Sequence, residues 1–109
     1  MKQDNFDNFD RLVGLTLRHI RKGRKIPCSV IAKKLGVTNY CYYTWERGQV
    51  SITLKNLILL LDIYQVKLET FLAMYSFVKK DEEKVLERAS HLAALLATEP
   101  RRDLKINHL

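Results

Sequence analysis

Apolar residues recur every three or four positions along most of the chain, a spacing typical of helices and not of strands. The first run covers residues 11–23 and ends at Gly23, which follows a basic flank. The second covers about residues 27–35. Pro27 suits a first helical turn because it needs no amide partner there, and Gly36 is a typical stop. The opening of the chain therefore predicts two helices.

The middle of the chain predicts three more helices. Thr38 is a good N-cap for a short helix over about 38–46, which ends at the stop signal of Gly48. Thr53 is a good N-cap for a fourth helix, and its apolar periodicity continues into a fifth that reaches Tyr75. The fourth and fifth helices are interpreted as the closing half of one core.

A sixth helix is predicted over about residues 80–98, and it ends before Pro100. Its first residues are acidic, which suits the positive end of a helix dipole. Apolar residues follow at spacings typical of one helical face, namely Val85, Ala89, Leu92 and Leu96. Because no strand pattern occurs, we expect an all-α fold. Its predicted parts are a flexible N-terminal arm over 1–10, a domain over 11–75, and a C-terminal helix and tail over 76–109.

Positive charge is concentrated in the middle of the chain. Residues 11–67 carry eleven Lys and Arg residues against Glu46 and Asp62, a net charge of +9, whereas residues 1–10 sum to −2. A basic block of this kind is typical of a domain that binds a polyanion. Ordinary solvated surface charge is the equal alternative at this point.

Several classes of function are excluded by what the sequence does not contain. Cys28 and Cys41 lie 13 positions apart without a CxxC pair, and the three histidines are scattered, so we expect no metal and no disulfide. No catalytic constellation or glycine-rich phosphate loop occurs, so we expect neither an enzyme nor a cofactor. No apolar run has the length of a signal peptide or a membrane span, and we expect a cytoplasmic protein without a membrane partner.

Residues 13–72 resemble the Cro and phage-repressor type of helix-turn-helix domain, also called xenobiotic-response-element-like. Four segments carry the resemblance: LRHIRKGRKI, VIAKKLGVT, YTWERGQ and TLKNLILLLDIYQVKLETFL. The resemblance implies a five-helix, lambda-repressor-like domain whose third helix lies in the major groove of DNA, followed here by a C-terminal helix. Pro27 and Cys28 depart from the family residues that contact phosphate and support the first base contact at the start of the second helix, and Gln65 replaces a frequent glycine.

The resemblance also implies which residues contact bases. Four residues occupy the positions of the third helix that the family exposes to DNA: Asn39, Tyr40, Tyr43 and Thr44. An asparagine can pair with adenine, a threonine can donate or accept, and a tyrosine can pack on a thymine methyl group or reach a phosphate. Support of the helix cap is the alternative role for Asn39. Tyr42 and Trp45 are expected to point inward.

Other residues are implied to bind phosphates or to brace the domain. The implied phosphate contacts are Thr38, Arg47, Gln49 and Ser51, with Lys33 and Lys55 as further candidates whose alternative is solvated surface charge. Arg21 and Glu46 match a partly buried salt bridge between the first and third helices. Cys41 on the third helix suggests a redox switch, but a small packing residue is the favoured interpretation.

A single reading helix contacts few base pairs, whereas a two-fold dimer doubles the contact on a palindromic site. The predicted dimer interface consists of Val85, Ala89, Leu92, Ala93 and Leu96. Folding of this stripe onto the chain's own domain is the alternative. We therefore predict a repressor that binds double-stranded DNA as a homodimer and is released when a regulatory protein binds the C-terminal helix. The alternative function is an antitoxin-like or bridging module whose main partner is another protein.

Overall fold

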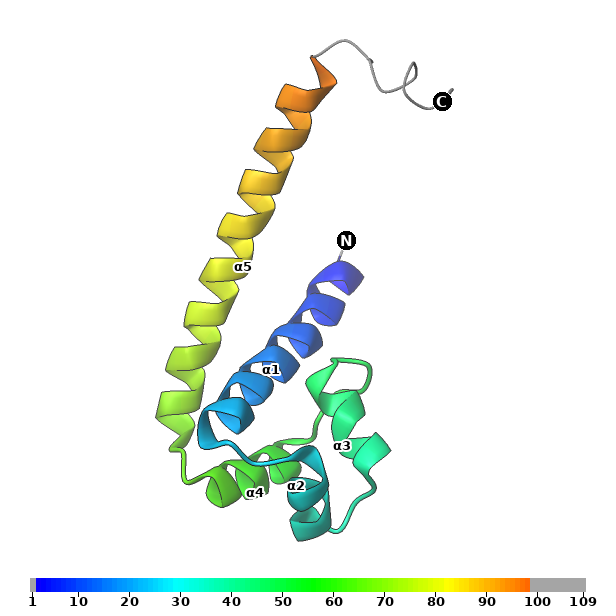
Figure 1. Ribbon diagram of the computed structural model, residues 1–109, viewed down its shortest axis with the longest axis vertical. Coiled ribbons are helices and arrows are strands. Elements are labelled where there is room, and N and C mark those ends of the chain that lie inside the picture. The colour runs from blue at the N-terminus through cyan, green and yellow to red at the C-terminus, as the bar shows by residue number, and fades with distance from the viewer. Residues whose placement is uncertain (1, 99–109) are drawn as a thin grey trace, which may run out of the picture. The chain divides into compact units, whose positions relative to one another are not determined.

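The computed structural model describes the backbone of residues 2–98 and the side chains of residues 8–98. These residues form helices without any strand, which confirms the all-α prediction (Figure 1). The helices, in chain order, are α1 (Lys2–Arg24), α2 (Cys28–Leu35), α3 (Asn39–Glu46), α4 (Leu54–Tyr64) and α5 (Leu68–Ala97).

The predicted caps fix the ends of the short helices. The Thr38 hydroxyl oxygen accepts a hydrogen bond from the amide of Cys41 at 3.0 Å, and the Thr53 oxygen accepts one from the amide of Asn56 at 3.1 Å. Gly36 ends α2 with a φ of 76°, a left-handed conformation that glycine adopts without steric cost. Only three residues, Gly36 to Thr38, therefore separate α2 from α3, as a helix-turn-helix requires.

Residues 2–10 differ from the flexible arm that was predicted, because they are helical and continuous with α1. They contain neither glycine nor proline, so nothing in their sequence stops a helix. Two contacts join the end of this segment to the rest of its unit. The Ser51 hydroxyl donates to the Asp10 carboxylate. The Phe9 and Tyr75 rings pack edge-on, and their centroids are 5.7 Å apart.

The predicted fifth and sixth helices are one helix, α5. The residues between them, 76–79, again contain no glycine or proline and so carry no stop signal. The chain nevertheless divides into two compact units at Lys79–Lys80, close to the predicted boundary after residue 75. We call residues up to 79 the first unit and residues from 80 onward the second unit.

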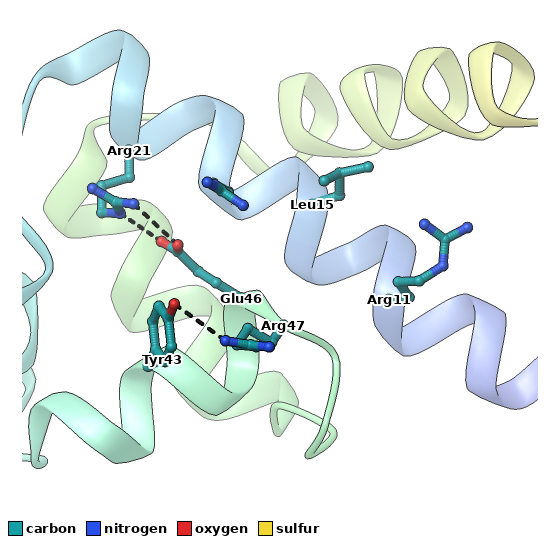
Figure 2. Close-up of a pocket in the computed structure, with 7 residues that line it drawn as sticks. Arg11, Leu15, Arg21, Tyr43, Glu46 and Arg47 are labelled. Atoms are coloured by element: carbon teal, nitrogen blue, oxygen red, sulfur yellow. Dashed lines mark hydrogen bonds and ion pairs between the residues drawn. The ribbon is translucent and has the colours of Figure 1, made fainter. Parts of the chain in front are cut away.

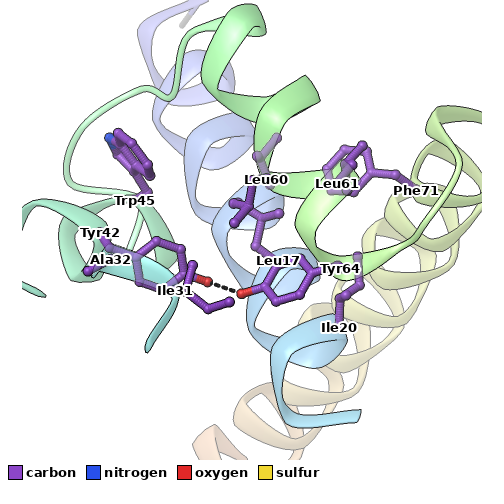
Figure 3. Packing of buried hydrophobic residues seen from close by; sticks show 11 residues of the cluster. Leu17, Ile20, Ile31, Ala32, Tyr42, Trp45, Leu60, Leu61, Tyr64 and Phe71 are labelled. Carbon is purple, nitrogen blue, oxygen red and sulfur yellow. Dashed lines mark hydrogen bonds between the residues drawn. The ribbon is translucent and has the colours of Figure 1, made fainter. Parts of the chain in front are cut away.

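All five helices contribute to the core of the first unit (Figure 3). Its buried apolar side chains are Leu12, Val13, Leu17, Ile20, Ile31, Ala32, Tyr42, Trp45, Leu60, Leu61, Tyr64 and Phe71. Tyr42 and Trp45 thus point inward as predicted. Because Phe71 belongs to this cluster, the first turns of α5 are part of the domain and not of the C-terminal element.

Two glycines allow α1 to lie directly against the end of α3. A Cβ atom at Gly14 would collide with the carbonyl oxygens of Trp45 and Glu46. A Cβ atom at Gly48, whose φ is 71°, would lie 2.5 Å from the Cα of Arg11. The orientation of α3 on the domain is therefore set by backbone contact as well as by side chains.

Candidate nucleic-acid interface

A salt bridge joins α1 to α3 beneath the exposed face of α3, as predicted. Arg21 Nε donates to Glu46 Oε2 at 2.6 Å, and Arg21 Nη2 donates to Glu46 Oε1 at 3.2 Å (Figure 2). A third donor, Arg21 Nη1, reaches the carbonyl oxygen of Ile26 at 3.2 Å. The Glu46 side chain is only 2% exposed, and paired, bidentate geometry is what makes a buried carboxylate tolerable.

Two buried tyrosines extend this salt bridge to α4. The Tyr42 hydroxyl donates to Glu46. It also lies within hydrogen-bond distance of the Tyr64 hydroxyl (Figure 3). Because Tyr42 has one hydroxyl hydrogen and gives it to Glu46, Tyr64 must donate to Tyr42. The sequence interpretation treated Tyr42 only as a packing residue. Because a buried tyrosine hydroxyl needs a hydrogen-bond partner, the predicted burial of Tyr42 already indicated that it would have one.

The protonation states of this network follow from its burial. Burial raises the pKa of Tyr42, and its hydrogen bond to Glu46 raises it further. Burial also raises the pKa of Tyr64, to about 12. The hydrogen bond to Glu46 raises the pKa of Arg21 above its ordinary value. Both phenols are therefore neutral and Arg21 is charged at neutral pH, so the network holds α3 to α1 and α4 in one state.

Three of the four predicted base-contact residues face solvent. Asn39 is exposed, Tyr40 is 74% exposed and Tyr43 is 46% exposed. These residues lie along α3 on the side that the core does not use. The prediction of a solvent-facing position therefore holds for them, and their contact with bases stays a prediction.

Thr44 departs from the predicted position. It is only 6% exposed, and its Oγ1 donates to the carbonyl oxygen of Cys41 at 2.6 Å. The prediction placed Thr44 on the outer face by assuming one buried stripe, but α3 packs against both α1 and α2, which widens the buried arc. A short side chain in that arc does not reach past its neighbours, so Thr44 is withdrawn as a base contact.

Arg47 is the best-positioned of the predicted phosphate contacts. Its Nη1 donates to the Tyr43 hydroxyl at 3.2 Å, and its guanidinium carbon lies 5.2 Å from the centre of the Tyr43 ring. A cation held against an aromatic ring loses less side-chain freedom when it binds an anion. Arg47 is thus an exposed and partly preorganised donor.

The remaining predicted phosphate contacts divide into two groups. Gln49, Lys33 and Lys55 are exposed, and Thr38 is exposed while its oxygen caps α3. Ser51 is different because its hydroxyl donates to the Asp10 carboxylate, which places negative charge where a phosphate was expected. Like charges repel, so Ser51 is withdrawn as a phosphate contact.

A pocket of about 380 Å³ lies between α1 and α3 (Figure 2). We call it the arginine pocket, and its lining residues are Arg11, Leu15, Arg18, Arg21, Tyr43, Glu46 and Arg47. The sequence interpretation did not assign Arg11 or Arg18 to any site. The available signal was their spacing, since Arg11, Leu15 and Arg18 follow one another at four and three positions and so share a helix face.

No family model, no curated protein and no solved structure matches the chain. The resemblance to Cro and the phage repressors therefore stays a prediction.

The second unit carries the predicted dimer stripe in an exposed state. Val85, Leu92 and Leu96 are at least half exposed, and Ala89 and Ala93 are exposed as well. Leu86 and Leu95 add to this apolar surface at 60% and 53% exposure. An apolar surface of this extent on a single helix is typical of a contact surface.

The two cysteines are free thiols, and burial raises the pKa of Cys28, which lowers its reactivity at neutral pH.

Within residues 8–98, no group of three or more metal-binding side chains comes together. Among the described helices, none combines the length and the apolar character that crossing a bilayer requires.

Proposed function

We propose that the chain is a sequence-specific DNA-binding transcriptional regulator that places α3 in the major groove. The observation that supports this proposal best is how α3 is held in the domain. A three-residue turn joins it to α2, a buried network fixes it to α1 and α4, and its outer face carries polar and aromatic side chains. The major groove is about 12 Å wide and admits one helix, so a rigid exposed helix of this kind suits it.

Base contact is assigned to Asn39, Tyr40 and Tyr43. An asparagine amide can bond to N6 and N7 of adenine together, which is a pairing that no other base pair offers. The two tyrosine rings supply apolar contact for a thymine methyl group, and their hydroxyls can reach a phosphate. Sites that contain A·T pairs are therefore favoured.

Phosphate contact is assigned to Thr38, Arg47 and Gln49, with Lys33 and Lys55 adding positive charge. These groups surround α3 in sequence and are exposed. Phosphate contacts supply affinity and fix the register of the helix, but they carry no sequence information. The +9 net charge of residues 11–67 supports the same assignment, since it favours association with a polyanion.

The regulator is proposed to act as a homodimer on a palindromic operator, in the manner of a repressor in the cytoplasm. The exposed apolar stripe of the second unit supports dimerisation, because two copies would bury it against each other. A regulatory protein that occupied the same stripe would separate the copies and release the DNA.

The second candidate is an antitoxin-like or bridging module whose main partner is a different protein. The same exposed stripe favours it, since a foreign helix would bury these leucines equally well. The two candidates differ in the partner that the second unit binds, which is a second copy of the chain in one and a different protein in the other. Sedimentation of the purified chain distinguishes them, because a repressor forms a dimer alone and a bridging module stays a monomer until its partner is added.

Selection of binding sites from random duplex DNA tests the proposed function, followed by titration of the enriched site at several salt concentrations. Phosphate contacts alone do not enrich a sequence, so an enriched palindrome supports a dimeric reader of bases. Absence of enrichment, together with weak binding that disappears at physiological salt, would overturn the proposal and leave the basic face with a purely electrostatic role.

A further inference from the structure

The arginine pocket holds more positive charge than its own residues balance. Four guanidinium groups line it, and Glu46 is the only carboxylate among the described residues of its lining. Both oxygens of that carboxylate are already engaged, one by Arg21 alone and the other by Arg21 and Tyr42. Arg11 donates a hydrogen bond to Asn8, whereas the guanidinium groups of Arg18 and Arg47 share no carboxylate of the pocket, and their mutual repulsion is relieved when an anion binds.

The donors of the pocket come from two helices. Arg11 and Arg18 extend from α1, and Arg47 extends from α3, where the Tyr43 ring and hydroxyl hold it in place. Figure 2 shows Arg47 and Tyr43 on one side of the pocket and Arg11 on the other. Donors from two separate elements that line one pocket can each take a different oxygen of the same anion.

The chemistry of these donors selects phosphate. A guanidinium group presents parallel N–H donors that match two oxygens of a phosphate, and several guanidinium groups fit a tetrahedral anion better than a planar carboxylate. The pocket, at about 380 Å³, has room for a phosphate with an attached group, and Leu15 provides an apolar wall. Tyr43 lines the pocket and also lies on the exposed face of α3, so an anion bound in the pocket would lie beside that face.

We propose that the arginine pocket is a phosphate-binding site formed by Arg18 and Arg47. Its phosphate comes either from a DNA strand that lies along α3 or from a free phosphate compound. Only the first source rests on the proposed function of the chain. The affinity of the pocket for a phosphate group does not depend on it.

Inorganic phosphate is the first probe. Phosphate is titrated into the full chain against chloride at matched ionic strength, and the arginine Nε–Hε signals are followed by NMR. We expect saturable shifts of the Arg18 and Arg47 signals. Arg18→Gln weakens phosphate binding about tenfold, as loss of a charged hydrogen bond does. Arg47→Gln is the second variant, and thermal melting of each variant confirms that it folds.

Lys22→Gln is the matched control. It removes one positive charge from an exposed position of α1 that does not line the pocket. We expect it to leave phosphate binding almost unchanged. Shifts that do not saturate, or equal weakening by Arg18→Gln and Lys22→Gln, would overturn the proposal, because both results describe a general charge effect and no site.

Duplex DNA is the second probe and identifies the source of the phosphate. If the source is DNA, Arg18→Gln lowers the slope of log K against log salt concentration by about one. An unchanged slope, with phosphate binding still lost in Arg18→Gln, assigns the pocket to a free phosphate compound. If the chain binds phosphate but no DNA, the proposed function fails while the pocket stands.

Discussion

The two units contain the same kinds of apolar residue, but only the first unit buries a cluster of them, although it also leaves some exposed, such as Leu54 and Phe77. In the first unit, leucines, isoleucines and aromatic residues of five helices bury one another, and even the carboxylate of Glu46 is enclosed. In the second unit, every leucine from Leu86 to Leu96 is more than half exposed. Periodic apolar residues therefore predict a helix in both places, but burial depends on whether other helices of the same unit are present to cover them.

The largest difference in stability between the two units is expected when one glutamate is substituted in each. Glu46→Gln removes the charge that pairs with Arg21 and leaves that guanidinium part-buried beside a neutral group. We expect the free energy of unfolding to fall by about 3–5 kcal/mol, as for a buried pair that loses one partner. Glu87 is exposed, and Glu87→Gln is the matched change in the second unit.

Urea denaturation of both variants measures the difference. Surface substitutions usually alter stability by less than about 0.5 kcal/mol, so Glu87→Gln is expected to resemble the unaltered chain. Equal losses in the two variants would contradict a buried, stabilising network in the first unit alone.

A leucine pair gives the next largest effect. Leu60 is fully buried and Leu92 is 63% exposed. Leu60→Ala is expected to cost about 2–5 kcal/mol through lost burial and the cavity that remains. Leu92→Ala is expected to leave the melting of the first unit unchanged and to weaken the dimer in sedimentation. A Leu92 variant that dimerises as tightly as the original chain would remove this stripe from the interface.

Gly14 and Gly23 provide a matched pair within α1. An alanine at Gly14 forces its Cβ atom onto the carbonyl oxygens of Trp45 and Glu46, and backbone atoms cannot turn away. We expect Gly14→Ala to destabilise the domain by about 1–3 kcal/mol despite the better helix propensity of alanine. No atom lies within 4 Å of the Cβ position at Gly23, so Gly23→Ala is expected to be neutral or slightly stabilising. Thermal denaturation shows which sign each variant has.

Tyr64→Phe is the smallest change and sharpens the account of the network. It removes the hydrogen bond that Tyr64 donates to Tyr42 and costs about 0.5–1.5 kcal/mol at pH 7. The folded chain raises the pKa of Tyr64 to about 12, above the value near 10 of an unfolded tyrosine. A raised pKa gives stability that is complete below pH 10 and is lost as the pH rises towards 12.

The pH dependence of unfolding therefore separates the variant from the original chain. Between pH 10 and 12, the free energy of unfolding is expected to fall less steeply for Tyr64→Phe. Tyr42 adds to the loss in both proteins, since its pKa is raised as well. Parallel curves over this range would show that Tyr64 does not titrate differently in the folded chain.

Sequence reasoning predicted the features of the first unit that depend on local signals. Thr38 and Thr53 cap helices as expected, Gly36 ends α2, and the bridge from Arg21 to Glu46 is present. Helix caps and stops depend on single residues and their neighbours in sequence, so they can be predicted without a structure.

The features it missed depend on distant packing or on the absence of a signal. Thr44 is buried because two helices cover α3, and Ser51 is engaged by Asp10, which is far away in sequence. Gly14 reads as a weak helix former, although its function is to admit the backbone of α3. The stretches 2–10 and 76–79 contain no stop signal, and the absence of a stop signal does not by itself predict that a helix continues.

The central claim is that the exposed face of α3 reads DNA sequence. Site selection from random duplex DNA, carried out side by side with the unaltered chain and Asn39→Ala, tests it most directly. Asn39 is exposed on α3, and its loss is expected to weaken the best site by about 1–3 kcal/mol and to relax one base position in each half-site. Identical enriched sequences from the two proteins, with equal weakening on all DNA, would contradict the claim and leave Asn39 a role at the DNA backbone.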